Sequence, residues 1–182
     1  GSGSGKTSLL NIMNGKIKPT FGSIEVNGIN LHDEKHKLEG VIGNVNQNDL
    51  LIEELTVFEN LYYSAKLCLK GLNQKYLTVK VNRLLTSLGL YEIKDLKVGS
   101  SIDKVISGGQ RKRLNIALEL IREPSVLFVD EPTSGLSSRD SDNIMDLLKE
   151  LSLKGKLVFV VIHQPSSNIF KLFDRLLILD QG

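Results

Sequence analysis

The sequence predicts an α/β fold in which a mostly parallel β-sheet carries helices on both faces. From residue 107 onwards, apolar runs alternate with amphipathic segments, a pattern typical of buried parallel strands that are connected by helices. Near the start, a glycine-rich turn leads directly into another helical pattern. Between residues 56 and 90 the apolar residues recur at helical spacing, so we expect a mainly helical insert in the sheet pattern.

The part before this insert predicts one helix and two short strands. Residues 8–13 continue from the glycine-rich turn as a helix, which Gly15 closes. Residues 23–28 alternate between apolar and polar side chains before a turn, as expected of a strand. Residues 41–45 predict a further short strand, and Gln47 follows its carboxyl end.

The part after the insert predicts alternating helices and strands. In open parallel sheets, ligands bind beyond the carboxyl ends of the strands. Asp130, Glu131 and His163 all stand at the ends of predicted strands, so we expect them along one edge of the sheet. The predicted elements are helices at 108–122, 138–151 and 167–173 and strands at 126–129, 157–162 and 175–179.

The composition is that of an ordinary globular protein. With 41% hydrophobic and 24% charged residues, the 182-residue chain can bury one core. A net charge of +2 is too small to indicate nucleic-acid binding, and we interpret the densest basic cluster, residues 111–113, as a solvated helix face. Cys68 is the single cysteine, which excludes an internal disulfide. No apolar run approaches the roughly 20 residues that a membrane-spanning helix needs.

A phosphate-binding loop is predicted at the start of the chain, where residues 3–7 read GSGKT. Backbone N–H groups of such a loop converge on phosphate oxygens, while Lys6 would reach the β- and γ-phosphates and Thr7 would ligate Mg²⁺. A glycine–serine linker is the alternative, but the loop runs straight into a helical pattern. The full motif has one more glycine ahead of Gly1, so we expect the sequence to begin inside it. The predicted nucleotide-binding residues of this loop are Gly1, Ser2, Gly3, Ser4, Gly5, Lys6, Thr7 and Ser8.

Two further motifs point to phosphate chemistry. A glycine-rich tetrapeptide opens the predicted helix at 108–122, and its N–H groups and serine hydroxyl would form an anion site; an ordinary capped helix start is the alternative. Asp130 and Glu131 end an apolar strand, which is where a carboxylate that orders Mg²⁺ and a base that acts on water are expected. The alternative is that the two acids only cap a helix. The tetrapeptide consists of Ser107, Gly108, Gly109 and Gln110.

In this order the motifs resemble those of the ATP-binding-cassette (ABC) ATPases, whose signature the tetrapeptide matches. The resemblance implies the P-loop NTPase fold of ABC ATPases, with a small antiparallel β part and a helical insert subdomain. Four further segments are similar to the G-subfamily, the pigment- and sterol-exporter type. These segments are residues 55–61, 116–120, 130–136 and 163–167.

The resemblance also implies a domain organisation. Residues 1–182 would form one ABC ATPase domain that is truncated at both ends. Residues 1–47 and 107–182 would make up a RecA-like core that includes the antiparallel β part. Residues from about 48 to 106 would make up the helical subdomain.

ATP and Mg²⁺ are the cofactors that the resemblance implies. Glu131 would polarise the attacking water, while Lys6 and His163 would neutralise charge on the γ-phosphate. Gln47 would contact Mg²⁺ or the water and report the γ-phosphate to the helical insert. Residues 107–110 would bind the γ-phosphate held by the P-loop of a second domain. The residues expected to serve the metal are Thr7, Gln47 and Asp130.

The function implied by the resemblance is that of the ATP-hydrolysing domain of a transporter, with export as the expected direction. Its partners would be a second nucleotide-binding domain and a transmembrane domain, at the cytoplasmic face of a membrane, without nucleic acid. A soluble ABC ATPase that acts on ribosomes or DNA is one alternative. A module that senses ATP without turnover is another, and Ser137 supports it, because the family usually has aspartate there to couple two ATP sites.

Overall fold

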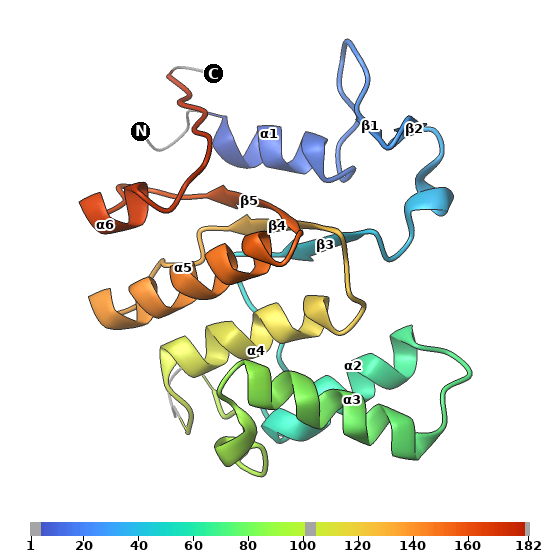
Figure 1. Ribbon diagram of the computed structural model, residues 1–182, viewed down its shortest axis with the longest axis vertical. Coiled ribbons are helices and arrows are strands. Elements are labelled where there is room, and N and C mark those ends of the chain that lie inside the picture. The colour runs from blue at the N-terminus through green and yellow to red at the C-terminus, as the bar shows by residue number, and fades with distance from the viewer. Residues whose placement is uncertain (1–4, 101–104, 181–182) are drawn as a thin grey trace.

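The computed structural model describes residues 5–100 and 105–180, in which helices alternate with short strands (Figure 1). The strands are β1 (Glu25–Val26), β2 (Ile29–Asn30), β3 (Ile42–Val45), β4 (Val126–Asp130) and β5 (Leu157–Val161). The α-helices are α1 (Lys6–Met13), α2 (Val57–Cys68), α3 (Gln74–Ser87), α4 (Gly108–Leu120), α5 (Ser138–Leu153) and α6 (Ser167–Phe170). Two 3-10 helices are η1 (Lys35–Leu38) and η2 (Tyr91–Ile93).

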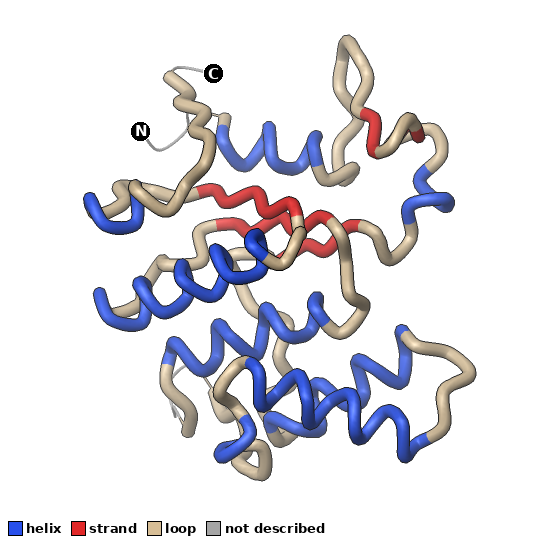
Figure 2. The backbone as a smooth tube through the Cα atoms, viewed as in Figure 1, coloured by secondary structure: helices blue, strands red, loops and turns tan. Residues whose placement is uncertain are grey.

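Helices cover both faces of a parallel sheet whose strand order is β3-β4-β5. On one face α1 packs against β4 and β5, whereas on the other α4 packs against β3 and α5 against β5. The tube in Figure 2 shows this layering, with α2 and α3 lying beyond α4 on the side away from the sheet. The predicted α/β class, with a mostly parallel sheet between helical layers, is therefore confirmed.

The central strand β4 sets the register of the sheet. Its first four residues, 126–129, are buried, as an apolar strand covered on both faces must be. Val129 pairs with Val45 of β3 and with Val160 of β5, and Asp130 pairs with Val161. The three carboxyl ends consequently meet at one edge of the sheet, which is the edge that Figure 1 shows on the same side as the first turn of α1.

The small antiparallel part is a hairpin between α1 and η1. Val26 pairs with Ile29, and the two connecting residues both have positive φ, 52° at Asn27 and 77° at Gly28. Asparagine followed by glycine is the sequence that a tight hairpin turn of this hand requires. The strand expected over 23–28 is thus present, although it is shorter because the turn begins at Asn27.

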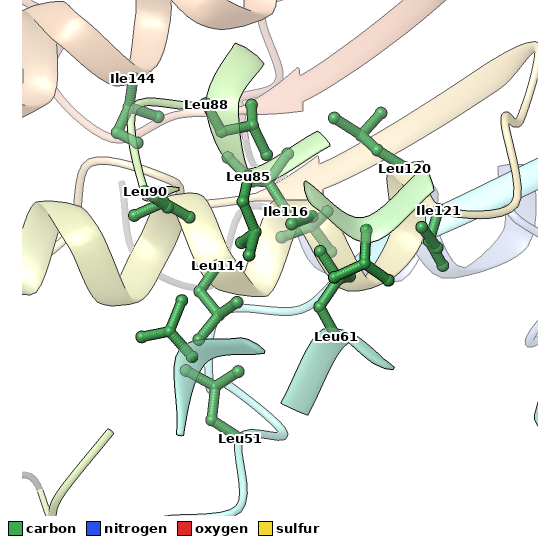
Figure 3. Packing of buried hydrophobic residues seen from close by; sticks show 14 of the residues in the cluster. Leu51, Leu61, Leu85, Leu88, Leu90, Leu114, Ile116, Leu120, Ile121 and Ile144 are labelled. Atoms are coloured by element: carbon green, nitrogen blue, oxygen red, sulfur yellow. The ribbon is translucent and has the colours of Figure 1, made fainter. Parts of the chain in front are cut away.

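The helical layer is held by a core that α2, α3 and α4 share. Thr56 caps α2 by accepting from the Glu59 N–H, and Glu59 accepts from the Thr56 N–H in return, which fixes where this helix starts. Figure 3 shows Leu61 of α2 and Leu85 of α3 beside Leu114 of α4, and all three side chains are fully buried. The division of the chain at residues 48 and 106 stays a prediction. No helix among the described residues is long and apolar enough to cross a membrane.

The strand predicted at 175–179 is wrong. These residues have no regular secondary structure, and Leu177 and Ile178 are 73% and 82% exposed. An apolar run becomes a strand only where it pairs with a neighbouring backbone, and the described part of the sheet extends no further than β5 on this side. The last helix is also shorter than predicted, since α6 ends at Phe170 rather than at residue 173.

Candidate nucleotide-binding and catalytic site

The strand ends bring Gln47 and Glu131 into contact. Val45 and Val129 are paired across β3 and β4, so residues that follow each of them by two positions lie side by side. Gln47 Nε2 donates a hydrogen bond to Glu131 Oε2 at 3.0 Å. Two residues that are far apart in the sequence, and that were both predicted as catalytic, therefore share one edge of the sheet.

Glu131 occupies an unusual backbone conformation. Its φ is 44°, a left-handed conformation that costs a non-glycine residue about 1–3 kcal/mol. Its N–H donates to the Val161 carbonyl at 2.9 Å, and its carbonyl accepts from the Ser134 N–H at 3.2 Å. These bonds end the strand and turn the chain sharply, so the Glu131 carboxylate stands beyond the sheet edge rather than in a face of the sheet.

Asp130 has the chemistry of a metal-binding carboxylate. Its Oδ1 is buried and has no hydrogen-bond partner among the described residues. Burial raises the pKa of the Asp130 carboxyl, the Glu131 charge raises it further, and the Lys112 and Lys16 charges lower it. A bound cation would satisfy the buried oxygen and offset the repulsion between the two acids, so this site fits Mg²⁺.

The other predicted ligands of Mg²⁺ are a hydroxyl and an amide. The described residues include no cluster of three or more histidine, cysteine, aspartate or glutamate side chains that would hold a metal. Thr7 lies in the first turn of α1, and Gln47 follows β3. A set of one carboxylate, one hydroxyl and one amide oxygen suits a cation that keeps several of its own waters, as Mg²⁺ does.

The start of α1 has the character of an anion-binding helix terminus. Its N-cap is Gly5, which has a φ of 83° and no side chain to accept a hydrogen bond, so the helix start has no side-chain cap. Uncapped N–H groups at the positive end of a helix bind phosphate readily. Lys6 is the first residue of this helix and Thr7 the second. The predicted loop residues Gly1, Ser2, Gly3 and Ser4 lie outside the described part of the chain.

The signature tetrapeptide begins α4 on the opposite face of the sheet from α1. Ser107 Oγ accepts from the Gln110 N–H at 3.1 Å, and Gln110 Oε1 accepts from the Ser107 N–H at 2.8 Å. The serine and glutamine side chains thus form a capping box. The capping box uses the N–H groups of Ser107 and Gln110, whereas the predicted anion site also includes the N–H groups of Gly108 and Gly109.

Gly109 has to be glycine because of Asp140 in the neighbouring helix. A Cβ at Gly109 would overlap Asp140 Oδ1 and would lie 2.7 Å from Asp140 Cγ. The Asp140 side chain is held there by Ser137, whose Oγ donates to Asp140 Oδ2 at 3.0 Å and accepts from the Asp140 N–H at 3.1 Å. Ser137, where aspartate was expected, therefore caps α5 and positions an aspartate one turn later.

His163 follows β5 by two residues and is exposed. Its neighbour Gln164 has a φ of 50°, so the chain turns here much as it turns at Glu131. Because β5 ends at Val161, beside Asp130 of β4, His163 lies beyond the carboxyl end of β5 on the edge where Asp130 ends β4.

The interpretation of residues 111–113 as a solvated face is wrong. Arg111 is only 16% exposed in its side chain, Lys112 is half-buried, and Arg113 Nε is buried. Arg111 Nε donates to Asp49 Oδ2 at 2.5 Å, and its Nη1 donates to the Gly99 carbonyl at 2.6 Å. The sequence signal for this burial is spacing: residues three and four positions apart share a helix face, and residues 111–113 precede the buried segment 114–117 by one turn.

Comparisons with known proteins agree on the family. The model of the family described as "ABC transporter" matches residues 1–134. Over its whole length, the chain is 44% identical to a probable ATP-dependent permease of Saccharomyces cerevisiae, and the match covers 18% of that protein. It is also 40% identical over its whole length to the broad substrate specificity ATP-binding cassette transporter ABCG2 of Rattus norvegicus, and this match covers 28% of that protein. The chain thus spans less than a third of the length of these curated relatives.

A solved structure shares the fold. It is a dimeric ATP-binding cassette in a post-hydrolysis state bound to ADP and Pi, with a TM-score of 0.80 and 30% sequence identity. The match covers the whole of the present chain and 79% of the chain in that structure. This likeness confirms the ABC ATPase fold that the sequence predicted. The chain belongs to the ABC transporter family.

Proposed function

We propose that this chain is the ATP-binding and ATP-hydrolysing domain of a membrane transporter of the ABC G type. The observation that carries the proposal is the contact of Gln47 with Glu131 at 3.0 Å, next to the buried Asp130 oxygen. An amide, a candidate base and a candidate metal ligand meet where ligands of parallel sheets bind. Transfer of a γ-phosphoryl group to water needs such positioning and charge neutralisation more than covalent chemistry.

Each residue of the site has a proposed role in hydrolysis. Lys6 and the N–H groups of α1 hold the β- and γ-phosphates, and Glu131 orients the water and accepts its proton. His163 contacts the γ-phosphate. When bound, Mg²⁺ neutralises phosphate charge, held by Thr7, Gln47 and Asp130.

The coupling partner would be a second domain of the same kind. The phosphate-binding start of α1 and the signature start of α4 lie on opposite faces of the sheet, so they are poorly placed to hold the same ATP molecule. Two domains arranged head to tail solve this, because each P-loop then faces the signature of its partner. The dimeric ATP-binding cassette with ADP and Pi supports this arrangement.

Transport, with export as the expected direction, is supported by the curated relatives. They include the ABCG2 transporter of Rattus norvegicus and ABC transporter G family member 28 of Arabidopsis thaliana, which is 41% identical over the whole chain. The chain would then act at the cytoplasmic face of a membrane, and closure of its dimer would drive attached membrane domains. The nucleotide is ATP, with Mg²⁺ as its metal.

Phosphate release by the full-length protein tests the proposal. We expect Mg²⁺-dependent release that Lys6→Ala abolishes, because this change removes the cation that faces the phosphates, whereas Lys154→Ala, at the far end of α5, leaves release unchanged. ATP binding without release in the wild type would instead indicate the ATP-sensing module. Release that is stimulated by ribosomes or DNA, and not by reconstitution into a membrane, would indicate the soluble ABC ATPase.

A further inference from the structure

The half-buried basic residues at the start of α4 hold the loop that carries Gln47. We call residues 46–49 the Gln47 loop. We propose that Lys112 is a positioning residue that ties this loop to α4, so that the placement of the signature turn determines how Gln47 meets Glu131. This inference rests on the proposed function, since it concerns the arrangement of the same catalytic edge.

The tie consists of side chains of α4 that reach backbone oxygens of the loop. Lys112 Nζ donates to the Gln47 carbonyl at 3.3 Å and to the Asn46 carbonyl at 3.4 Å. Asn115, one turn further along α4 and buried, donates its Nδ2 to the same Asn46 carbonyl at 3.5 Å. A side chain that holds two successive carbonyls fixes the path of the backbone and therefore the direction of the Gln47 side chain.

Two further contacts hold the ends of the Gln47 loop. Arg111 grips Asp49 with two nitrogens, Nε at 2.5 Å and Nη2 at 3.2 Å, a fork geometry that restricts orientation as well as distance. From the other face of the sheet, Lys16 Nζ donates to Asn46 Oδ1 at 2.6 Å. The centre of the loop, where Gln47 leaves the backbone, is held by Lys112.

Lys112 differs from the other anchors because its charge also faces the acids. Burial lowers the pKa of the Lys112 amine, and the carboxylates of Asp49, Asp130 and Glu131 offset part of this effect by favouring its protonated form. In return, the Lys112 charge offsets part of the rise that burial and the Glu131 charge cause in the pKa of the Asp130 carboxyl. The same amine thus binds the Gln47 loop and offsets part of the repulsion between Asp130 and Glu131. It does both from α4, and not from the phosphate-binding turn of α1.

The geometry predicts what movement of α4 would do. Lys112 stands only two residues after the signature tetrapeptide, on the same rigid helix. A displacement of the signature turn when it meets nucleotide would move Lys112 and the two carbonyls that it holds. Gln47 would then shift relative to Glu131. Nucleotide binding at the signature turn would thereby change the position of the Glu131 carboxylate.

The test compares three variants of the full-length protein. Lys112→Met keeps the length and the apolar stem but removes the donors and the charge, and Lys112→Arg keeps both. Lys154→Met is the matched control, because Lys154 is an exposed lysine at the end of α5. The readouts are kcat and KM for ATP, thermal unfolding, and hydrogen exchange of the backbone amides of residues 46–53 without nucleotide.

We expect Lys112→Met to lower kcat by about tenfold, since misplacing a catalytic group by about 1 Å can cost about 100-fold. KM for ATP should change by less than about threefold, because phosphate binding is unaffected. Amides of residues 46–53 should exchange faster, and Lys112→Arg should restore both kcat and exchange.

Unchanged kcat and unchanged exchange in a folded Lys112→Met protein would overturn the inference, as would a loss of kcat that follows the folded fraction and that arginine does not restore. A wild type without ATP turnover would instead refute the proposed function. The exchange measurement needs no turnover, so it would still decide whether Lys112 holds the Gln47 loop.

Discussion

Asp130 and Glu131 are adjacent in the sequence, but the fold gives them different surroundings. Asp130 Oδ1 is buried without a partner among the described residues, whereas Glu131 Oε2 accepts from Gln47 beyond the sheet edge. The strand end causes this difference, since the last paired residue, Asp130, still belongs to β4 and the next turns away at a φ of 44°. The two carboxylates thus have the different surroundings that the proposed roles of metal ligand and base require.

The buried charge of Asp130 should weaken the nucleotide-free protein. Because its folded pKa is raised above the unfolded value, the ionised carboxylate disfavours folding at pH values above the folded pKa, and this penalty disappears as pH falls below the unfolded value of about 4. We expect Asp130→Asn to raise the unfolding temperature at pH 7 and to lose this advantage as the solution is acidified, while Mg²⁺-dependent ATP affinity and turnover fall.

Calorimetry of the nucleotide-free protein between pH 7 and pH 4 would measure this effect. A variant that is less stable than the wild type at pH 7 would show that burial of Asp130 carries no such penalty. Asp142→Asn is the matched control, since Asp142 is an exposed aspartate of α5 and the same carboxyl-to-amide change there involves no burial.

At the scale of elements, the contact between α4 and α5 explains a glycine that the signature motif alone does not. Gly109 lies against the Asp140 carboxylate, which Ser137 holds by two hydrogen bonds. The start of the signature helix is thereby fixed relative to the start of α5.

Gly109→Ala should destabilise the protein by about 1–3 kcal/mol, because the added methyl group must displace a tethered side chain. A Gly109→Ala, Asp140→Ala double variant lacks the two closest contacts, those with Asp140 Oδ1 and Cγ, so we expect the two effects to be less than additive. Chemical denaturation of the four proteins of this cycle would measure the coupling. Strict additivity would mean that Asp140 does not limit residue 109.

Several elements could be predicted from the sequence because their signals are local. The apolar run of β4 and the helical spacing of apolar residues from residue 56 onwards identify β4 and α2 without any knowledge of the fold. Residues 175–179 have the same apolar character as β4, yet they form no strand, because pairing depends on a distant backbone. The contacts of residues 111 and 112 with the Gln47 loop could not be predicted for the same reason, since their partners lie far away in the sequence.

The residues of the candidate site could be predicted from the sequence, but the contacts between them could not. Order and spacing identified Gln47, Glu131 and the signature tetrapeptide as candidates through their resemblance to a family. Their hydrogen bonds, including the capping box of Ser107 and Gln110, depend on side-chain geometry that motifs do not specify. Ser137 shows the limit well: the sequence reveals that serine stands where the family usually has aspartate, but the role of this serine as the cap of α5 is visible only in the structure. Its effect on coupling between two ATP sites stays a prediction.

For the whole molecule, the separation of α1 and α4 by the sheet makes the head-to-tail dimer a testable requirement. Ser107→Arg should leave ATP binding by one domain nearly intact but prevent closure, because a bulky cation would obstruct the anion site at the helix start. Ser107→Ala is the control, since it loses the same helix cap, worth about 1 kcal/mol, without added bulk. Distances between labels on the two domains, measured with and without ATP, would detect closure. Closure that survives Ser107→Arg would contradict the head-to-tail arrangement.

The central claim is that Glu131 is the base of an ATPase, and the hydrolysis rate of Glu131→Gln tests it most directly. Glutamine keeps the shape of glutamate but cannot accept the proton, and loss of a general base typically lowers a rate by about 10²–10⁴-fold. Mg²⁺ and ATP should still bind through Lys6, Thr7 and Asp130, so we predict that the full-length variant retains ATP in a closed dimer after free nucleotide is removed. Hydrolysis within a few-fold of the wild type would contradict the account, and if His163 were then still essential, the histidine would be the main organiser of the water.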